Sequence, residues 1–177
     1  GAGRGAPGRP SARGPRATVV GMETSPTPVR WDGAVNAWRV RPGLFRMGRA
    51  EWLTDAGWAE LAADGVSAVI DLRMPQEVKR REHDPAHAGV PAGVTWENHP
   101  IEDADDAGFR ARFDPYPNHP AHYPDLLERY PDRIGAALAR TLTAMEGGGA
   151  VLHCSAGRDR TGPVSYTHLT LPTIYSV

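Results

Sequence analysis

The chain has 177 residues, of which 40% are apolar, and a formal net charge of −1 at pH 7. This length and composition are typical of one α/β domain. The near-neutral charge excludes a general attraction to nucleic acid or to anionic membranes, and the single cysteine excludes an internal disulfide. No apolar stretch is long enough to span a bilayer, and no signal peptide is visible. We therefore expect a soluble cytoplasmic protein with no nucleic-acid partner and no stable membrane association.

The first part of the chain predicts a disordered leader followed by a strand and a helix. Residues 1–30 are rich in Gly, Pro, Ala and Arg and offer little to bury, which is typical of disorder. Order is expected to begin near Trp31–Trp38, and Leu44–Met47 predicts a short strand. Thr54 has the residue type of a helix N-cap, and Gly65 that of a helix end, so a helix is expected between them.

The middle of the chain predicts two strands, a long connection and a long helix. The nearly continuous apolar run Val66–Leu72 indicates a buried parallel strand, and Val94–Trp96 indicates an edge strand. From about Ile101 to Pro124, a Pro/His/Asp-rich connection predicts an irregular loop of the kind that often forms a functional lid. Leu126–Met145 predicts a helix interrupted at Pro131. Its expected apolar face consists of Ile134, Leu138, Leu142 and Met145.

One segment near the C-terminus carries most of the functional information. A predicted strand, Ala150–His153, runs into the sequence His153-Cys154-Ser155-Ala156-Gly157-Arg158-Asp159-Arg160-Thr161-Gly162. A strand, a tight loop and a helix start together present backbone N–H groups to an anion. The same dipoles stabilise a thiolate at Cys154, and Gly157 can take a backbone conformation forbidden to other residues.

These residue types suit the cleavage of a phosphate monoester. Cys154 is the candidate nucleophile, and the fork of Arg160, six positions later, can clamp two phosphoryl oxygens. The hydroxyl of Thr161 can donate a hydrogen bond to the sulfur and so assist its departure. We expect neither a metal nor another cofactor. The candidate substrate-binding residues are Ser155, Ala156, Gly157, Arg158, Asp159 and Arg160.

The general acid has two candidates. Asp159 is the first, because repulsion from a thiolate and a phosphate keeps a neighbouring carboxyl group protonated. The alternative role for Asp159 is an ion pair with Arg158 or Arg73 that shapes the loop. Asp103, at the head of the long connection, is the second candidate acid. For Asp71, at the end of its strand, an ion pair with an arginine is expected.

Two pairs of histidines have spacings that occur in metal sites. They lack nearby cysteines and a clear helical frame, so surface histidines are the favoured interpretation. The pairs are His83 with His87 and His119 with His122.

The cysteine loop resembles the signature of protein tyrosine phosphatases. It is most similar to a bacterial tyrosine/serine phosphatase family whose loop reads His-Cys-x-x-Gly-Lys-Asp-Arg-Thr-Gly, with Arg158 here in place of lysine. The resemblance runs from about Val35 to Gly162. It extends to Val40–Arg46, to Val69–Arg73 followed by Glu77, and to Tyr123–Leu127.

The resemblance implies both a fold and an activity. The fold is α/β and protein-tyrosine-phosphatase-like, with a central, mainly parallel sheet flanked by helices. The activity is hydrolysis of phosphotyrosine through a phosphocysteine intermediate. Phosphoserine, phosphothreonine and phosphoinositides are further substrates that the family suggests.

The end of the chain departs from the family pattern. Residues 163–177 lack charged residues, contain many β-branched ones and include Pro172, which argues against a native helix. The expected organisation is a leader over 1–30, an incomplete phosphatase domain over 31–162 and a non-native-looking tail over 163–177. A phosphatase truncated after its phosphate-binding loop, with its C-terminal helices missing, would be weakly active or inactive.

Two alternative functions stay open at this point. Arg158 adds positive charge inside the loop, which would suit the polyanionic head group of a phosphoinositide. The second alternative is an inactive module that binds phosphate without hydrolysing a substrate. The sequence does not predict an oligomeric state.

Overall fold

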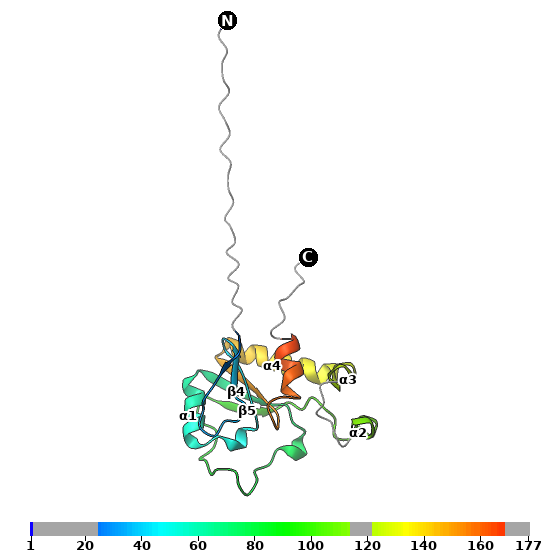
Figure 1. Ribbon diagram of the computed structural model, residues 1–177, viewed down its shortest axis with the longest axis horizontal. Coiled ribbons are helices and arrows are strands. Elements are labelled where there is room, and N and C mark those ends of the chain that lie inside the picture. Colours follow the sequence, from blue (N-terminus) through cyan, green and yellow to red (C-terminus); the bar gives the residue numbers. More distant parts are fainter. Residues whose placement is uncertain (2–24, 114–121, 169–177) are drawn as a thin grey trace.

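The computed structural model describes residues 1, 25–113 and 122–168, which form a central sheet with helices on both faces (Figure 1). The sheet is six-stranded, in the order β1-β2-β3-β6-β4-β5. Its strands are β1 (Thr27–Pro28), β2 (Trp38–Arg41), β3 (Leu44–Met47), β4 (Val66–Asp71), β5 (Thr95–Asn98) and β6 (Gly149–His153). The pairs β3–β6, β4–β6 and β4–β5 are parallel, whereas β1–β2 and β2–β3 are antiparallel. The expected mainly parallel α/β sheet is confirmed.

In the described ranges, four α-helices and three shorter helical turns connect and cover the strands. The α-helices are α1 (Asp55–Ala63), α2 (Ala107–Phe113), α3 (Tyr123–Arg129) and α4 (Pro131–Glu146). The shorter turns are η1 (Ala50–Trp52), η2 (Pro75–Glu77) and the π-helical η4 (Pro163–His168). Within residues 25–113 and 122–168, no helix combines the length and the apolar character that a membrane span requires.

The start of α1 and the break between α3 and α4 follow the sequence prediction. Thr54 Oγ1 accepts a hydrogen bond of 3.2 Å from the Gly57 N–H, so it is the N-cap of α1. Gly65, just beyond the helix, has a φ of +84°, which a residue with a Cβ rarely adopts. The helical segment after residue 122 is interrupted between Arg129 and Pro131, as expected from the proline.

The buried face of α4 is narrower than predicted. It consists of Ile134, Ala137, Thr141 and Ala144. Leu142, which was predicted on this face, is 46% exposed. The small side chains at positions 137 and 144 let α4 lie close to the sheet, so the longer residues Leu138 and Met145 pack only at its margin.

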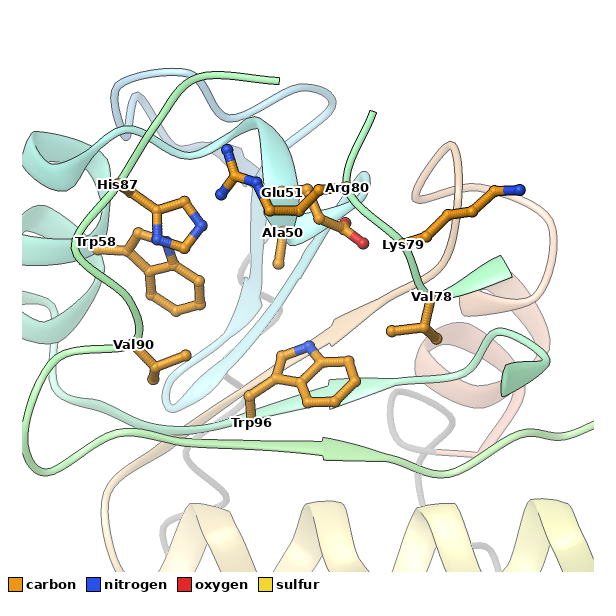
Figure 2. A pocket seen from close by; sticks show the side chains of 9 residues that line it. All are labelled: Ala50, Glu51, Trp58, Val78, Lys79, Arg80, His87, Val90 and Trp96. Atoms are coloured by element: carbon orange, nitrogen blue, oxygen red, sulfur yellow. The ribbon is translucent and has the colours of Figure 1, made fainter. Parts of the chain in front are cut away.

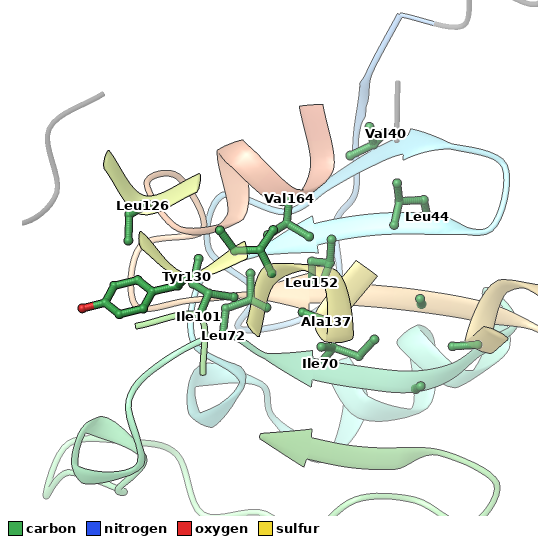
Figure 3. Close-up of a cluster of buried hydrophobic side chains, with 14 of the residues drawn as sticks. Val40, Leu44, Ile70, Leu72, Ile101, Leu126, Tyr130, Ala137, Leu152 and Val164 are labelled. Atoms are coloured by element: carbon green, nitrogen blue, oxygen red, sulfur yellow. The ribbon is translucent and has the colours of Figure 1, made fainter. Parts of the chain in front are cut away.

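Alternation along the central strands builds a core on each side of the sheet. On β4, Ala68 and Ile70 pack toward α3 and α4, whereas Val69 packs with Trp58 and Leu61 of α1. Figure 3 shows the cluster on the α3–α4 side, to which β6 contributes Leu152. Because both faces of β4 and β6 are covered, their ends are held firmly at one edge of the sheet.

Ordered structure begins earlier than the sequence predicts. Strand β1 lies inside the segment 1–30 that was expected to be disordered, and Thr27 pairs with Arg39 of β2. Pro28 weakens any strand signal, because proline cannot donate a ladder hydrogen bond, but it is tolerated at the edge of a sheet. The expected boundary at residue 30 is therefore wrong by a few residues.

The long connection contains a helix that was not predicted. Helix α2 lies within the segment 101–124, whose residues 114–121 fall outside the described part of the chain. Asp106 Oδ1 caps α2 by accepting a hydrogen bond of 2.9 Å from the Phe109 N–H. The Phe109 ring packs edge-on against Tyr130 with 5.3 Å between ring centroids. A capping aspartate and an aromatic contact with Tyr130 thus stabilise a short helix inside a connection whose Pro, His and Asp residues predicted an irregular loop.

The start of the predicted tail is helical and packed. Val164 and Ser165 are fully buried, and Val164 belongs to the same apolar cluster as Leu152 (Figure 3). Ser165 Oγ donates a hydrogen bond of 2.7 Å to the Thr161 carbonyl. The expectation of no helix after residue 162 is therefore wrong for 163–168, because burial of Val164 outweighs its poor helix propensity. Residues 169–177 lie outside the described part of the chain.

An ion pair between the edge strand and α4 leads to a testable prediction. Arg140 Nε and Nη2 donate hydrogen bonds of 2.8 and 2.6 Å to the Glu97 carboxylate on β5. Chiefly through these bonds, the pKa of Glu97 is lowered to about 2 from its ordinary value of 4.5. We expect Glu97→Gln to lower the free energy of unfolding by about 0.5–1 kcal/mol at pH 7.

The same prediction has a pH dependence. A lowered carboxylate pKa contributes stability above about pH 4.5, and this contribution is lost as the pH falls toward 2. Urea unfolding at pH 7 and near pH 2 should therefore show a difference between Glu97→Gln and wild type only at pH 7. The matched control is Glu128→Gln, an exposed position on α3. An equal loss of stability at both pH values would contradict this account.

Candidate active site

The cysteine loop lies at the end of the sheet where the parallel strands finish. Strand β6 ends at His153, and the helical segment that includes η4 begins at Thr161, so residues 154–160 form the turn between them. Cys154 is buried, with 3% of its surface exposed. The carboxyl edge of parallel strands is where ligands bind in open α/β sheets.

Five successive carbonyl groups of this loop point away from its centre. Each carbonyl from Cys154 to Arg158 accepts at least one hydrogen bond of 2.9–3.5 Å from a donor outside residues 154–160. The Cys154 carbonyl accepts from His153 Nδ1, and the Ser155 carbonyl accepts from Arg49 N. The Ala156 and Gly157 carbonyls both accept from Asn36 Nδ2, and the Gly157 carbonyl also accepts from Arg46 Nη1. The Arg158 carbonyl accepts from Gly162 N and Tyr123 Oη.

The opposite side of the same peptides carries the N–H groups. Because C=O and N–H point in opposite directions within a peptide, the outward carbonyls turn the N–H groups of residues 155–159 toward the loop centre. Within the described ranges, no residue accepts a hydrogen bond from these N–H groups. Successive inward N–H groups form a nest that binds anions.

Gly157 is required by the path of this loop. Its φ is +69°, and a Cβ at this position would lie 2.3 Å from the backbone C and O of Met47. Any larger residue would therefore push the loop away from β3 as well as strain its own backbone. The left-handed conformation expected of Gly157 is present.

Arg160 is held beside the loop by two carboxylates. Its Nε donates a hydrogen bond of 3.0 Å to Glu102 Oε1, and its Nη1 lies 2.9 Å from Glu77 Oε2. Burial lowers the pKa of Arg160, but the two carboxylates outweigh burial and the net shift is upward. Among the described residues, Nη2 has no partner, so this end of the guanidinium stays available to a ligand.

Glu102 and Glu77 were not identified as site residues from the sequence. They lie 58 and 83 positions from Arg160, so no local spacing links them to it. Both follow shortly after the end of a strand, β5 for Glu102 and β4 for Glu77, and Glu77 also belongs to a stretch that resembles the family. Burial raises the pKa of Glu102, and Arg160 offsets only part of this rise.

A second ionic cluster lies beneath the loop. Asp71 is fully buried and accepts hydrogen bonds of 2.9 and 2.6 Å from Arg73 Nε and Nη2, which confirms the expected ion pair. Arg73 Nη2 also lies 2.9 Å from Glu51 Oε1. His153 Nε2 is 3.6 Å from Asp71 Oδ2, and burial lowers the His153 pKa. A neutral His153 donates a hydrogen bond of 3.4 Å from Nδ1 to the Cys154 carbonyl.

Asp159 lies in the loop that begins at Cys154. It is 7% exposed, and its Oδ1 lies 3.2 Å from Arg158 Nε, so one of the two expected arginine pairs is present. Burial raises the pKa of Tyr123, and the negative charges of Asp159 and Cys154 add to this rise. The phenol, the carboxylate and the thiol therefore share one electrostatic environment.

Asp103, the other candidate acid, lies on the side of the site nearest α4. Its carboxylate is 2.8 Å from Arg133 Nη2, and 38% of its side chain is exposed. The preceding residue, Glu102, is the one that contacts Arg160. Asp159 thus lies in the cysteine loop, paired with Arg158, whereas Asp103 is paired with Arg133 of α4.

The remaining predicted residues differ in their environments. Thr161 is fully buried, but its Oγ1 has no hydrogen-bond partner in the described part of the chain, so the expected bond to the cysteine sulfur is not formed. Ser155 Oγ donates a hydrogen bond of 3.3 Å to Glu77 Oε1. Ala156 is exposed, as is the side chain of Arg158 at 72%.

No metal cluster accompanies the loop in the described residues, where no three His, Cys, Asp or Glu side chains are grouped to hold an ion. His87 packs instead against the Trp58 ring, 6.0 Å between centroids, and His119 lies outside the described residues. The rings of His87, Trp58 and Trp96 line a cavity of about 270 Å³ (Figure 2). None of residues 154–160 lines this cavity, so it is separate from the cysteine loop.

Comparisons with known proteins agree with this geometry. Residues 33–172 match the tyrosine phosphatase family. The triple specificity protein phosphatase PtpB of Mycobacterium tuberculosis is 35% identical over 159 residues, which cover 74% of this chain and 56% of PtpB. The chain therefore spans little more than half the length of this relative.

Two crystal structures of TpbA from P. aeruginosa are also similar. One is a cysteine-to-serine variant in complex with phosphotyrosine, at 19% identity and a TM-score of 0.45, covering 77% of this chain and 62% of TpbA. The other has 20% identity and a TM-score of 0.42, covering 74% and 64%. Because the family match takes in most of the chain and the whole 154–160 loop, this protein belongs to the tyrosine phosphatase family.

Proposed function

We propose that this protein hydrolyses phosphotyrosine monoesters through a phosphocysteine intermediate. The observation that supports this most directly is the set of inward N–H groups of residues 155–159 around the buried Cys154. A phosphate monoester is a dianion, and preorganised N–H dipoles stabilise the charge on its three terminal oxygens. Membership of the tyrosine phosphatase family supports the same chemistry.

The first step transfers the phosphoryl group to sulfur. The Cys154 thiolate attacks phosphorus, the S–P bond forms, and the bond from phosphorus to the tyrosine oxygen breaks. The N–H groups and Arg160 bind the phosphoryl oxygens throughout. In the second step, water attacks the phosphocysteine, inorganic phosphate leaves, and the thiolate is restored.

Arg160 contributes a charge whose position is fixed before the substrate arrives. Glu102 and Glu77 hold two of its nitrogens, so the guanidinium loses little freedom when Nη2 binds a phosphoryl oxygen. A planar fork suits this role better than the single ammonium of lysine. The two carboxylates are thus positioning groups for the arginine.

Asp159 is the general acid that the geometry favours over Asp103. The phenol of tyrosine has a pKa of about 10, so its departure is faster when a proton is supplied to the leaving oxygen. Both carboxylates are paired with an arginine, but Asp159 is buried in the loop that begins at Cys154, whereas 38% of the Asp103 side chain is exposed. In the second step, Asp159 takes a proton from the attacking water.

Replacement of the nucleophile tests the proposal. Cys154→Ser should lower the hydrolysis of p-nitrophenyl phosphate by at least about 1,000-fold, because an alcohol at this position is a far weaker nucleophile than a thiolate. Release of p-nitrophenol measures turnover, and thermal melting checks that the variant is folded. Unchanged turnover in a folded Cys154→Ser protein would end the proposal.

Two aspartate variants identify the general acid. Asp159→Asn should slow the hydrolysis of phosphotyrosine by about 100- to 10,000-fold. The loss should be smaller with p-nitrophenyl phosphate, whose leaving group needs less protonation. Asp103→Asn is the matched comparison and should lose little with either substrate. The opposite pattern, with the leaving-group dependence in Asp103→Asn, would assign the acid to Asp103.

A further inference from the structure

We propose that Asn36 is a positioning residue for the candidate catalytic loop. Its side-chain amide holds the Ala156 and Gly157 carbonyls outward, so that the adjacent N–H groups face the phosphoryl oxygens. This inference rests on the proposed function, because it assigns to Asn36 the geometry of the anion-binding loop. Asn36 itself touches neither the thiol nor the substrate oxygens in this scheme.

The amide of Asn36 is matched to two acceptors. Its Nδ2 donates hydrogen bonds of 3.0 Å to the Ala156 carbonyl and 3.1 Å to the Gly157 carbonyl. A carboxamide NH₂ has two hydrogens, one for each of these oxygens. The other end of the amide is fixed as well, because Asn36 Oδ1 accepts a hydrogen bond of 2.9 Å from Trp38 Nε1. All three bonds together define one orientation of the side chain.

The carbonyls of Ala156 and Gly157 receive hydrogen bonds from side chains, whereas those of Ser155 and Arg158 receive them from the backbone. The carbonyls of Ser155 and Arg158 accept hydrogen bonds from the backbone N–H groups of Arg49 and Gly162. In the part of the chain that the structure describes, the carbonyls at 156 and 157 receive no backbone donor. Removal of a side chain can therefore release this part of the loop without any change in the main-chain ladder.

The backbone at Asn36 also points to a special position. Its φ is +53°, and it is the single non-glycine residue with a positive φ among those that the structure describes. Asparagine enters this left-handed region more readily than most residues, because its short side chain can form local hydrogen bonds. Such conformations persist where the surrounding interactions fix them, and they are concentrated at functional sites.

Arg46 supports the same peptide from β3. Its Nη1 donates a hydrogen bond of 3.3 Å to the Gly157 carbonyl. Its guanidinium lies over the Trp38 ring at 6.0 Å from the ring centre. Trp38 thus contacts both Asn36 and Arg46, and we call these three residues the supporting group. The supporting group holds the carbonyl side of the 156–157 segment, while the N–H groups on the opposite side face the ligand.

Loss of the Asn36 amide would change the direction of the backbone dipoles that surround the ligand. A carbonyl oxygen that turned inward would face the thiolate and the phosphate with a negative dipole end, and one N–H group would be lost from the nest. Two neutral hydrogen bonds of ordinary strength correspond to about a tenfold change in an equilibrium constant. This sets the size of the expected effect.

The test uses Asn36→Gly in the full 177-residue chain. Glycine adopts the positive φ readily and removes the side chain together with its amide. We expect the inhibition constant of inorganic phosphate to rise about tenfold and kcat/KM for p-nitrophenyl phosphate to fall about tenfold. Alkylation of Cys154 by iodoacetamide at neutral pH should also slow, because fewer dipoles favour the thiolate. Because Asn36 is exposed, the melting temperature should change little.

Three other variants test whether the effect comes from the hydrogen bonds of Asn36. Asn36→Asp has the same size but lacks both donors and adds a negative charge, so its loss should be at least as large. Trp38→Phe removes the Nε1 donor and keeps a ring beneath Arg46, so we expect about a twofold to threefold loss. Val35→Ala is the matched control, because Val35 is exposed next to Asn36 and contributes no side chain to the loop. It should behave as the wild type.

The outcomes separate this inference from the proposed function. Folded Asn36→Gly and Asn36→Asp proteins with wild-type phosphate inhibition and wild-type alkylation would overturn the inference alone. Wild-type turnover that survives in Cys154→Ser would overturn the proposed function. Phosphate protection of Cys154 against iodoacetamide requires binding but no turnover, so it measures the loop geometry even in a protein that does not hydrolyse the test ester.

Discussion

The site depends on one constraint: the carbonyls of residues 154–158 must all point away from the loop centre. A peptide chain does not adopt this arrangement without external donors, because each outward carbonyl needs a partner. Most of those donors are far from the loop in the sequence, namely Asn36, Arg46, Arg49 and Tyr123, and two, His153 and Gly162, adjoin it. The antiparallel part of the sheet, β1–β2–β3, thus also contributes to the geometry of the loop. It carries or flanks the side chains that keep the N–H groups of the loop facing a common centre.

Buried charges around the loop have a geometric role. Arg73 lies between Asp71 and Glu51, and Arg160 lies between Glu77 and Glu102. Buried ion pairs contribute little net stability, since desolvation offsets most of their attraction. Their effect is instead to fix the direction of each guanidinium. The pair of glutamates sets the direction of the Arg160 guanidinium.

Local signals predicted the fold better than they predicted the surroundings of the loop. The apolar run 66–72 and the cap at Thr54 act within a few residues, and both gave the correct element. Asn36 and Glu102 act on partners 120 and 58 positions away, so their roles become visible only once the sheet is assembled. Helix α2 likewise depends on the contact of Phe109 with Tyr130 rather than on its own propensity. The sequence thus indicated Cys154 and Arg160 as candidate site residues, but not the distant residues that contact the loop and the arginine.

The order of the strands explains why these distant residues meet. Strand β6 lies between β3 and β4 and is parallel to both, so the segments that follow all three strands emerge at one edge. The segment after β3 brings Arg49 to the Ser155 carbonyl. The segment after β4 brings Glu77 to Arg160, and the segment after β5, one strand further out, brings Glu102 to the same guanidinium. A sheet with β6 at its edge would leave one flank of the loop without donors or carboxylates. The central place of β6 therefore brings hydrogen-bond donors and carboxylates to both flanks of residues 154–160.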